Sequence, residues 1–469
     1  MRSLSVLLLS TVLAGTGCSR SPAAPAATAA VPGPAGPTFI HDDLVKATAM
    51  ALADKKLLFV DAWAPWCHTC LSMQREVLDT PEFGAFADRV VFVAIDTDRP
   101  ANAAFLAAHP VSLWPTFFVL DPATPAGLPL AKHPGSLSLP AMLTFVGDAV
   151  AAGPGRRQLP PLPQNIPGET AIAAAHAAQT RGDVEAAVAA FDTAVAALGP
   201  DHPRRGDVLI EAAWARTKSA DAAGCVAFIT AHDAEVAARG LGGAAFDLQG
   251  ALLSCVDKLP DPAAQQRLRE GARTRLQALL ASPPRGAAVD DRADAMATLA
   301  DLEHTLGAPA AAVAAIHVDR LKLLESDANS ATTEKGAQVH DYARMNSLLA
   351  LGRGDEAVTL LQARAKAIPD DYEPRARLAS ALFRLKRLDE ATVAVDDAIR
   401  LSYGPRRLRY LSLKADIEGA RGDVAASRAA LQRIVDDGAA LDAAMKAGGI
   451  VATATERLKA LDSAPVAAH

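Results

Sequence analysis

The sequence predicts an α/β domain near the N-terminus, followed by an all-α array of helices that fills the rest of the chain. At 469 residues the chain exceeds the roughly 250–300 residues at which a single hydrophobic core stops growing, so more than one folded unit is expected. Between Ala47 and Gly153, short apolar runs rich in Val and Phe alternate with helical stretches, as expected for strands covered on both faces. Beyond residue 168 these runs vanish and amphipathic helical stretches repeat, which indicates helices packed on helices.

The charge composition argues against one class of partner. The chain has 47 Lys plus Arg against 53 Asp plus Glu, and neither a basic stripe nor an acidic tail stands out. Nucleic-acid binding normally depends on clustered Lys and Arg that neutralise phosphates. We therefore expect no nucleic-acid partner.

The N-terminal segment 1–18 has the outline of an export signal. A charged start is followed by an apolar run, well short of the roughly 20 residues that span a bilayer, and then by small residues up to Cys18. Cys18 lies where a bacterial lipoprotein signal places its lipid-modified cysteine, although Gly15 stands where a Leu is usual, and cleavage near residues 27–29 is the alternative. Residues 19–38, rich in Ala and Pro, are expected to form a tether. We predict export to the periplasm and membrane anchoring by lipid on Cys18.

Cys67 and Cys70 form the motif with the clearest chemistry. They follow a buried apolar run and begin a predicted helix that extends from about Cys67 to Leu78. Their i, i+3 spacing on a helix places both sulfurs on one face, within bonding range. Unpaired N–H groups and the helix dipole favour a thiolate at Cys67, so Cys67 is the expected nucleophile and Cys70 the thiol that resolves a mixed disulfide. His68, between them, is expected to stabilise the Cys67 thiolate further.

The sequence around these cysteines resembles a known family. Residues 59–70, which include Trp66, resemble the active-site region of the thioredoxin family almost position for position. Residues 114–120, which begin Trp114-Pro115-Thr116, resemble the cis-proline loop and following strand of that family. The resemblance implies a thioredoxin fold for residues 39–152.

The same resemblance implies roles for individual residues. Asp61, at the end of a strand predicted to be buried, would take and return the proton of Cys70. The backbone at Trp114 and Pro115 would pair with an extended substrate segment opposite Cys67. Trp66 and His68, beside the cysteines, are expected to contribute to substrate binding as well.

Several alternatives remain open for this motif. A C-x-x-C pair can be half of a zinc site, but no second C-x-x-C or H-x-x-x-H completes four ligands, so no metal and no cofactor are expected. The pair can also be an inert disulfide in a fold that has lost its redox activity. Asp61 can be a merely satisfied polar group, and His68 a solvated loop residue. A lysine that thioredoxins often keep near this aspartate would align at Phe92, which leaves the tuning of Asp61 open.

The rest of the chain resembles tetratricopeptide repeats. A Pro-rich break at residues 153–168 separates it from the α/β domain. Within residues 169–465, Ala357 and Ala391 occupy equivalent small positions one repeat apart, since that repeat has a period of roughly 34 residues. The last unit departs from this period, as expected for an altered turn at residues 403–405. The resemblance implies an all-α solenoid whose concave face binds peptides or protein surfaces, and the alternative is a purely structural array.

Two further cysteines lie in the helical part. Cys225 and Cys255 are equally far in sequence from Gly240, which belongs to a Gly-rich turn, and an antiparallel helix pair would place them at the same height. A structural disulfide and a pair of buried thiols are both compatible with this spacing. The aromatic residues of this part are interpreted as helix-packing residues: Trp214, Tyr342, Tyr372, Tyr403 and Tyr410.

These observations lead to a functional hypothesis. We expect an exported thiol–disulfide oxidoreductase that acts on protein thiols or disulfides, exchanges electrons with a membrane or periplasmic donor or acceptor, and binds clients on its repeat domain. One alternative is a holdase resembling the bacterial chaperedoxins, which also place a thioredoxin domain before tetratricopeptide-like helices. Another is a redox-silent protein-binding scaffold.

Overall fold

The structure is a computed structural model that describes most of the chain. The described residues are 36–111, 113–124, 129–152, 167–200, 202, 205–239, 243–284, 287–445 and 448–463. The predicted signal at 1–18 with Cys18, the tether up to residue 35 and the linker from 153 to 166 lie outside them. Within the described ranges, no helix combines the length and the apolar character needed to cross a bilayer.

A five-stranded mixed sheet organises the N-terminal part. The strands are β1 (Ile40–His41), β2 (Leu57–Trp63), β3 (Val90–Asp96), β4 (Thr116–Leu120) and β5 (Pro129–Pro134), in the spatial order β1-β3-β2-β4-β5. β1, β3 and β2 run parallel, whereas β4 is antiparallel to both β2 and β5. Every residue of β3 and β4 is buried, as the continuous apolar runs predicted.

Helices cover both faces of this sheet, which confirms the predicted α/β domain. They are α1 (Leu44–Asp54), α2 (His68–Met73), the π-helix η1 (Gln74–Leu78), α3 (Pro81–Gly84), the 3-10 helix η2 (Pro100–Asn102), α4 (Ala103–Ala108) and α5 (Leu139–Ala152). One core lies under α1 and α4, and the other lies under α2, η1, α3 and α5. The second core is largely aromatic, with Phe59 stacked on Phe117.

The remaining elements are helices, which confirms the predicted all-α part. They are α6 (Pro167–Arg181), α7 (Val184–Ala197), α8 (Arg205–Arg216), α9 (Ala222–Ala238), α10 (Ala244–Val256), α11 (Pro262–Ala281), α12 (Val289–Thr305), α13 (Ala310–Ser330), α14 (Glu334–Gln338), α15 (Asp341–Ala350), α16 (Gly354–Ala367), α17 (Glu373–Arg384), α18 (Leu388–Leu401), α19 (Gly404–Arg421), α20 (Val424–Ala439), the 3-10 helix η5 (Ala443–Met445) and α21 (Gly448–Ser463).

These helices stack as a solenoid. Successive helices pack on each other, and several also contact the next but one, such as α15 with α17 and α17 with α19. Ala357 and Ala391, the positions one repeat period apart, are both completely buried where helices approach each other. Cys225 in α9 and Cys255 in α10 are joined by a disulfide across one of these antiparallel pairs.

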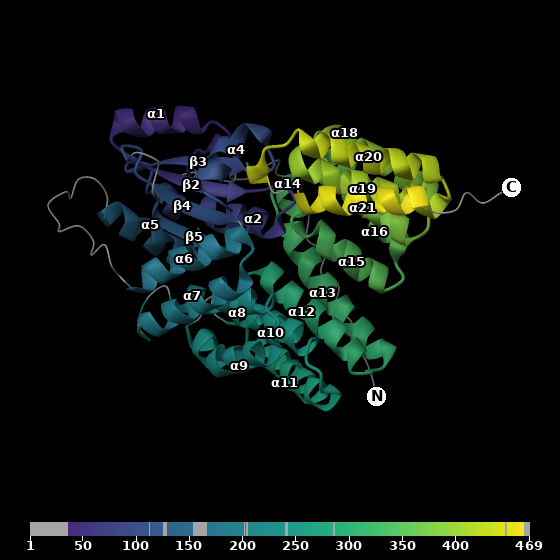
Figure 1. Cartoon of the computed structure of the whole chain (residues 1–469), viewed down its shortest axis with the longest axis horizontal. Helices are drawn as coiled ribbons and strands as arrows, with labels where there is room; N and C mark the ends of the chain where they lie inside the picture. Colours follow the sequence, from purple (N-terminus) through teal and green to yellow (C-terminus); the bar gives the residue numbers. More distant parts are fainter. Residues whose placement is uncertain are drawn as a thin grey trace, which may run out of the picture.

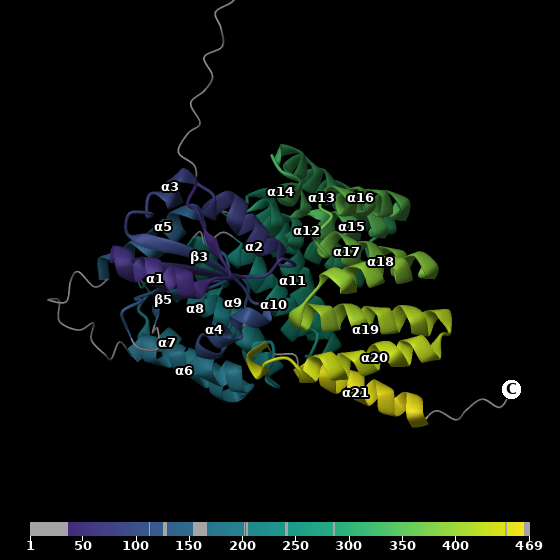
Figure 2. The same cartoon turned by 90° about the horizontal axis from the view of Figure 1, so that it is seen from above.

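The solenoid curves around the α/β domain. Figures 1 and 2 show an arc of helices that begins at α6, beside the sheet, passes through α12 and α13, and returns to the sheet domain near η5 and α4. Met445 of η5 is buried in the same core as Phe105 and Val111 of the α/β domain. The two parts therefore share apolar core as well as surface contacts.

Candidate redox site

The two cysteines of the C-x-x-C motif lie where α2 begins. Cys67 is the N-cap residue of α2, and its sulfur accepts a hydrogen bond from the Cys70 N–H at 3.0 Å. A disulfide joins the two residues, whose Cα atoms are 5.2 Å apart. The predicted helix from Cys67 to Leu78 is present, although its second half, from Gln74, is π-helical. When the pair is reduced, the helix N–H groups and dipole around Cys67 favour its thiolate.

Asp61 is a buried carboxyl group on β2, upstream of Cys67. It is 6% exposed and lies in register with Ala94 and Phe117 on the neighbouring strands. Its Oδ1 atom has no hydrogen-bond partner among the described residues. Burial raises the pKa of Asp61 to about 8, and no charged neighbour contributes, since Phe92 occupies the position that a lysine often fills. Asp61 is thus mostly protonated at neutral pH and can exchange a proton in the range where thiols ionise.

Two tryptophans lie against the redox pair. The Trp66 and Trp114 rings are 5.3 Å apart, and both pack on the small cluster that contains the two cysteines. Trp66 Nε1 donates to Asp98 Oδ2 at 2.6 Å, and Trp114 Nε1 donates to Thr97 Oγ1 at 2.7 Å. The peptide bond between Trp114 and Pro115 is cis. Of the residues that the sequence singled out, the structure thus brings Trp66 and Trp114 together with Cys67 and Cys70.

The solenoid reaches the redox motif through α12 and α13. His68 Nε2 lies 3.2 Å from Asp294 Oδ2, and the other oxygen of Asp294 lies 3.4 Å from Arg320. Burial disfavours the charged ring, but the hydrogen bond and negative charge of Asp294 outweigh it, so the pKa of His68 is raised. Further along the helix, Arg75 pairs with Asp327 at 2.6 Å. His68 is thus paired with the helical array and is not simply solvated.

The start of α19 covers Trp66. The Arg406 guanidinium lies 4.7 Å from the centre of a Trp66 ring, and Arg406 Nε donates to Tyr410 at 3.0 Å and to Glu373 at 3.3 Å. Cys67 is only 5% exposed in this arrangement. The face of the α/β domain that carries the redox pair is therefore occupied by the chain's own helices.

The altered turn at residues 403–405 is a contact between the two parts. The Tyr403 hydroxyl donates to Asp96, and the Arg99 guanidinium lies 4.7 Å from the Tyr403 ring. Gly404 has φ +53°, and a Cβ there would lie 1.9 Å from the carbonyl oxygen of Asp98. Only glycine allows this close approach. The departure from the repeat period thus coincides with the docking of α19 on the redox domain.

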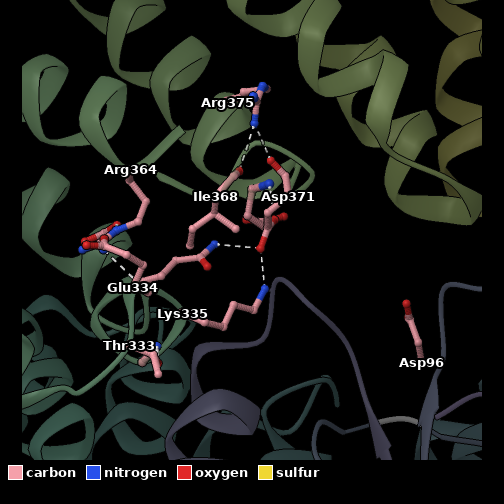
Figure 3. Close-up of polar contacts among 12 residues, drawn as sticks. Asp96, Thr333, Glu334, Lys335, Arg364, Ile368, Asp371 and Arg375 are labelled. Carbon is pink, nitrogen blue, oxygen red and sulfur yellow. Dashed lines mark hydrogen bonds and ion pairs between the residues drawn. The ribbon is translucent and has the colours of Figure 1, made fainter. Parts of the chain in front are cut away.

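A buried polar network holds α17 in place behind this contact. Lys335 pairs with Asp371, and Gln338 Nε2 donates to the same carboxylate at 3.3 Å (Figure 3). The other oxygen of Asp371 accepts from the Glu373 N–H at 2.8 Å. Glu373 in turn accepts from Arg406. The network therefore links α14 through α17 to the cation that lies over the redox-site tryptophan.

A cavity of about 740 Å³ opens between the redox helix and the solenoid. One wall includes Thr69 and Ser72 of α2 together with Trp114, and the opposite wall is formed by α8, α10 and α12. Its volume lies in the range of sites for small molecules or short peptide segments. Across the described ranges, no three His, Cys, Asp or Glu side chains gather in a way that could hold a metal ion.

Sequence reasoning did not identify the solenoid residues at this site. Asp294 and Arg406 are ordinary surface-type charges in amphipathic helices, and no local pattern distinguishes them. Tyr403 was expected only to pack between helices, whereas its hydroxyl bonds to Asp96. The only available signal was the irregular turn at residues 403–405.

Comparison with known proteins supports the first part of the chain. Residues 40–122 match a family model described as thioredoxin-like. A comparison with curated proteins finds no match. Similar solved structures include a tetratricopeptide repeat protein from Parabacteroides merdae, with 13% identity and a TM-score of 0.38 over 64% of this chain and 100% of that one. A thermophilic TPR protein of Thermus thermophilus has 16% identity and a TM-score of 0.27 over 54% of this chain and 98% of that one.

The similarity to these solved structures is too low to bear on activity. The identification depends instead on the family match, on the C-x-x-C pair at a helix start and on the stacked helix pairs. Residues 40–122 form a thioredoxin-like domain, and an array of stacked helices follows it and curves around the face that carries Cys67 and Cys70 (Figures 1 and 2).

Proposed function

We propose that this protein is a thiol–disulfide oxidoreductase of the cell envelope that acts on protein disulfides through Cys67 and Cys70. The observation that supports this most directly is the bonded pair at the N-terminus of α2, in a domain that also has a buried carboxyl group with a pKa of about 8. A helix N-terminus makes one cysteine acidic, and the proton-accepting group is tuned to the same pH range.

The chemistry can be written with these residues. In the reduced protein, the Cys67 thiolate attacks one sulfur of a client disulfide, which forms a Cys67–client bond and releases a client thiolate that takes up a proton. The ionised form of Asp61 accepts the proton of Cys70, and the Cys70 thiolate attacks Cys67 and expels the second client sulfur. Two electrons pass to the client and the Cys67–Cys70 disulfide forms. A membrane or periplasmic dithiol donor then reduces it, and with an oxidising partner the same steps run in reverse.

The location of the protein is part of the proposal. We infer export by the segment 1–18, lipid attachment at Cys18 and a tether up to residue 38, from the sequence pattern alone. Labelling with a radioactive fatty acid tests this, because Cys18→Ser should lose the label and leave the membrane fraction. Retention of the label in Cys18→Ser would contradict it.

Turnover is the direct test of the activity. The full-length protein should accelerate the reduction of a short disulfide-linked peptide by dithiothreitol, Cys67→Ser should abolish the acceleration, and Cys225→Ser should keep it. Equal rates with and without Cys67, or a Cys67 thiol that ionises near the ordinary pKa of about 8.5, would overturn the proposal. The reduction potential gives the direction: roughly −270 mV indicates a reductant and roughly −120 mV an oxidant.

The covered redox face favours one second candidate, a client-binding protein whose disulfide does not turn over. Arg406 lies over Trp66, and Cys67 is almost fully buried. Under this candidate, unfolded client protein binds equally well to the wild type and to Cys67→Ser, and neither one reduces the small disulfide dithiobis(nitrobenzoate) faster than free cysteine does.

A further inference from the structure

The cavity of about 740 Å³ lies beside the redox helix. Thr69, Ser72 and Trp114 line it, and these residues adjoin the two cysteines in the sequence or in the packed cluster. Trp66 is covered by Arg406. A substrate segment in this cavity therefore lies beside the redox helix without undocking the solenoid, and a space of about 740 Å³ admits an extended segment and excludes a folded protein.

The walls of this cavity are rich in acidic residues. Two lysines line it, Lys132 and Lys218, and Lys132 donates to a backbone carbonyl. Six carboxyl groups line it, and they come from both parts of the chain: Glu76, Glu211, Asp247, Asp290, Asp291 and Asp294. Whether the space favours a cation depends on which of these carboxyl groups the fold leaves without a partner.

Most of these carboxyl groups already have a partner. Glu76 pairs with Arg75, Glu211 with His176, and Asp294 with His68. Asp291 accepts from the Ala288 N–H at the start of α12, at 2.8 Å, and burial raises its pKa to about 8, so it is largely neutral at pH 7. These four groups are explained by the fold itself.

Asp247 and Asp290 are not paired with a cation in this way. Asp290 is 6% exposed, and its Oδ1 atom has no hydrogen-bond partner among the described residues. Asp247 is exposed to the space of the cavity, but the surrounding walls displace bulk water from it. This desolvation, together with the charges of Asp294 and Asp290, raises the pKa of Asp247 to about 6, so it is still ionised at pH 7. A ligand cation would pair with the ionised Asp247, and a ligand donor would satisfy the buried Oδ1 atom of Asp290.

A second observation comes from α2. Ser72 is 4% exposed, lines the cavity, and its hydroxyl oxygen has no hydrogen-bond partner of ordinary geometry among the described residues. It lies near enough to Asp290 to favour the charged form of that carboxyl group, although burial raises the pKa of Asp290 by more. Two neighbouring buried groups, one from each part of the chain, are thus left without a full hydrogen bond and can be satisfied by polar atoms of a ligand.

An exposed aromatic side chain also lines the cavity. Trp214 of α8 lines the cavity and is 41% exposed, which is unusual for so large an apolar side chain. Gly250 lies beside it: an added Cβ at Gly250 would be in ordinary contact with the indole, at 4.0 Å. Indole faces attract ammonium and guanidinium groups, and carboxylates attract them more strongly when partly desolvated.

We propose that this cavity is the substrate site and that it selects extended, positively charged peptide segments, with Lys or Arg close to the reacting cysteine. The proposal rests on the thiol–disulfide activity proposed above and adds the class of substrate. The cationic side chain lies between Trp214 and the carboxylates of Asp247 and Asp290, while the peptide's polar backbone meets Ser72. The client sulfur then lies next to the redox helix.

Matched peptides test the substrate class. The probes are the homodimeric disulfides of acetyl-Lys-Gly-Cys-Gly-Lys-amide and acetyl-Glu-Gly-Cys-Gly-Glu-amide, reduced by the full-length protein with dithiothreitol as the electron source. We expect kcat/KM to be about tenfold or more higher for the basic peptide, and the ratio to shrink as salt is added. The double variant Asp247→Asn with Asp290→Asn should bring the ratio close to one. The control Asp355→Asn changes an aspartate that is 94% exposed on α16 and outside the cavity lining, and should keep the wild-type ratio.

A binding measurement separates this proposal from the proposed activity. The variant Cys67→Ser with Cys70→Ser should bind acetyl-Lys-Gly-Ser-Gly-Lys-amide in a calorimetric titration, and Trp214→Leu in that background should weaken binding. No binding, or equal binding of the Glu analogue, overturns the substrate class even if the wild type still reduces dithiobis(nitrobenzoate). Binding of the basic peptide without any turnover by the wild type would instead overturn the proposed enzymatic activity, and the cavity would then be a cation-selective peptide site.

Discussion

Replacing Asp61 by Asn should make the thioredoxin-like domain more stable and less active. The pKa of this carboxyl group is raised from 3.8 to about 8, so in the unfolded chain it ionises at low pH and in the folded domain it does not. At pH 7 the folded state therefore holds a proton that the unfolded state has lost. Over the 3.2 pH units between 3.8 and 7, at 1.36 kcal/mol per unit, this costs the fold about 4 kcal/mol. A buried amide with unmade hydrogen bonds costs roughly 1–3 kcal/mol, so we expect a net gain of about 1–3 kcal/mol in Asp61→Asn.

The pH dependence has a definite sign. Because the unfolded state binds fewer protons between about pH 4 and pH 8, the free energy of unfolding of the wild type should fall with rising pH by up to about 1.4 kcal/mol per unit from this group. Asp61→Asn should lack that component. The assay is urea unfolding at several pH values, followed by tryptophan fluorescence, since three of the four tryptophans lie in the thioredoxin-like domain, and the slopes of variant and wild type are compared. Asp88→Asn, at an exposed surface position, is the control.

Two results would refute this reasoning. A variant that is less stable than the wild type at pH 7 would mean that the Asp61 carboxylate is paired in solution. An unchanged slope would mean that its pKa is ordinary. Disulfide turnover at pH 7 should fall about tenfold or more, because Cys70 loses the group that accepts its proton.

The other predictions concern contacts made by the solenoid. Asp294→Asn should lower the pKa of His68, as followed by NMR, because the aspartate favours the charged ring. In the wild type, the same contact should stabilise the docking of the solenoid fully below the ordinary His pKa of 6.5 and lose its effect as pH rises through the raised pKa of His68. An unchanged His68 titration in Asp294→Asn would argue against the contact. Cys225→Ser opens a disulfide that closes a loop with a sequence separation of 30, so the free energy of unfolding of that helix pair should drop by about 3–4 kcal/mol without loss of redox turnover. Calorimetry checks the stability, and the reduction of a disulfide-linked peptide checks the turnover. Arg406→Ala removes the cation over Trp66. The ratio of two rates of Cys67–Cys70 reduction, by a protein-sized dithiol and by dithiothreitol, should then rise about two- to fivefold. An unchanged ratio would indicate that α19 does not limit access.

The Asp294 and Arg406 variants both probe the contacts by which the solenoid covers the redox pair. The solenoid holds the thioredoxin-like domain at the CxxC helix, through Asp294, and over Trp66, through Arg406. Under the proposal above, small reductants and extended peptides reach the redox pair from the cavity, whereas folded clients require the two parts to separate. Selectivity by size and charge therefore follows from the way the domains are packed.

Local sequence was sufficient to predict the elements that depend on interactions between residues close in the sequence. Strands covered on both faces require continuous apolar runs, and a helix that starts with cysteines at i and i+3 must bring them within bonding range. For the same reason, small residues that recur once per repeat predicted the stacked helices around Ala357 and Ala391. The predicted α/β part and the all-α part followed from these patterns alone.

Tertiary structure alone decided what surrounds the redox pair. Asp294 lies 226 residues from His68 in the sequence, and the hydroxyl of Tyr403 reaches Asp96 across 307 residues. Such pairings depend on the summed curvature of many helix crossings, and each crossing angle is set by side-chain packing that leaves no periodic signal in the sequence. The CxxC chemistry could therefore be predicted from one short motif. The acidic cavity and the contact of Arg406 with Trp66 exist only because the whole solenoid curves back onto the domain that precedes it.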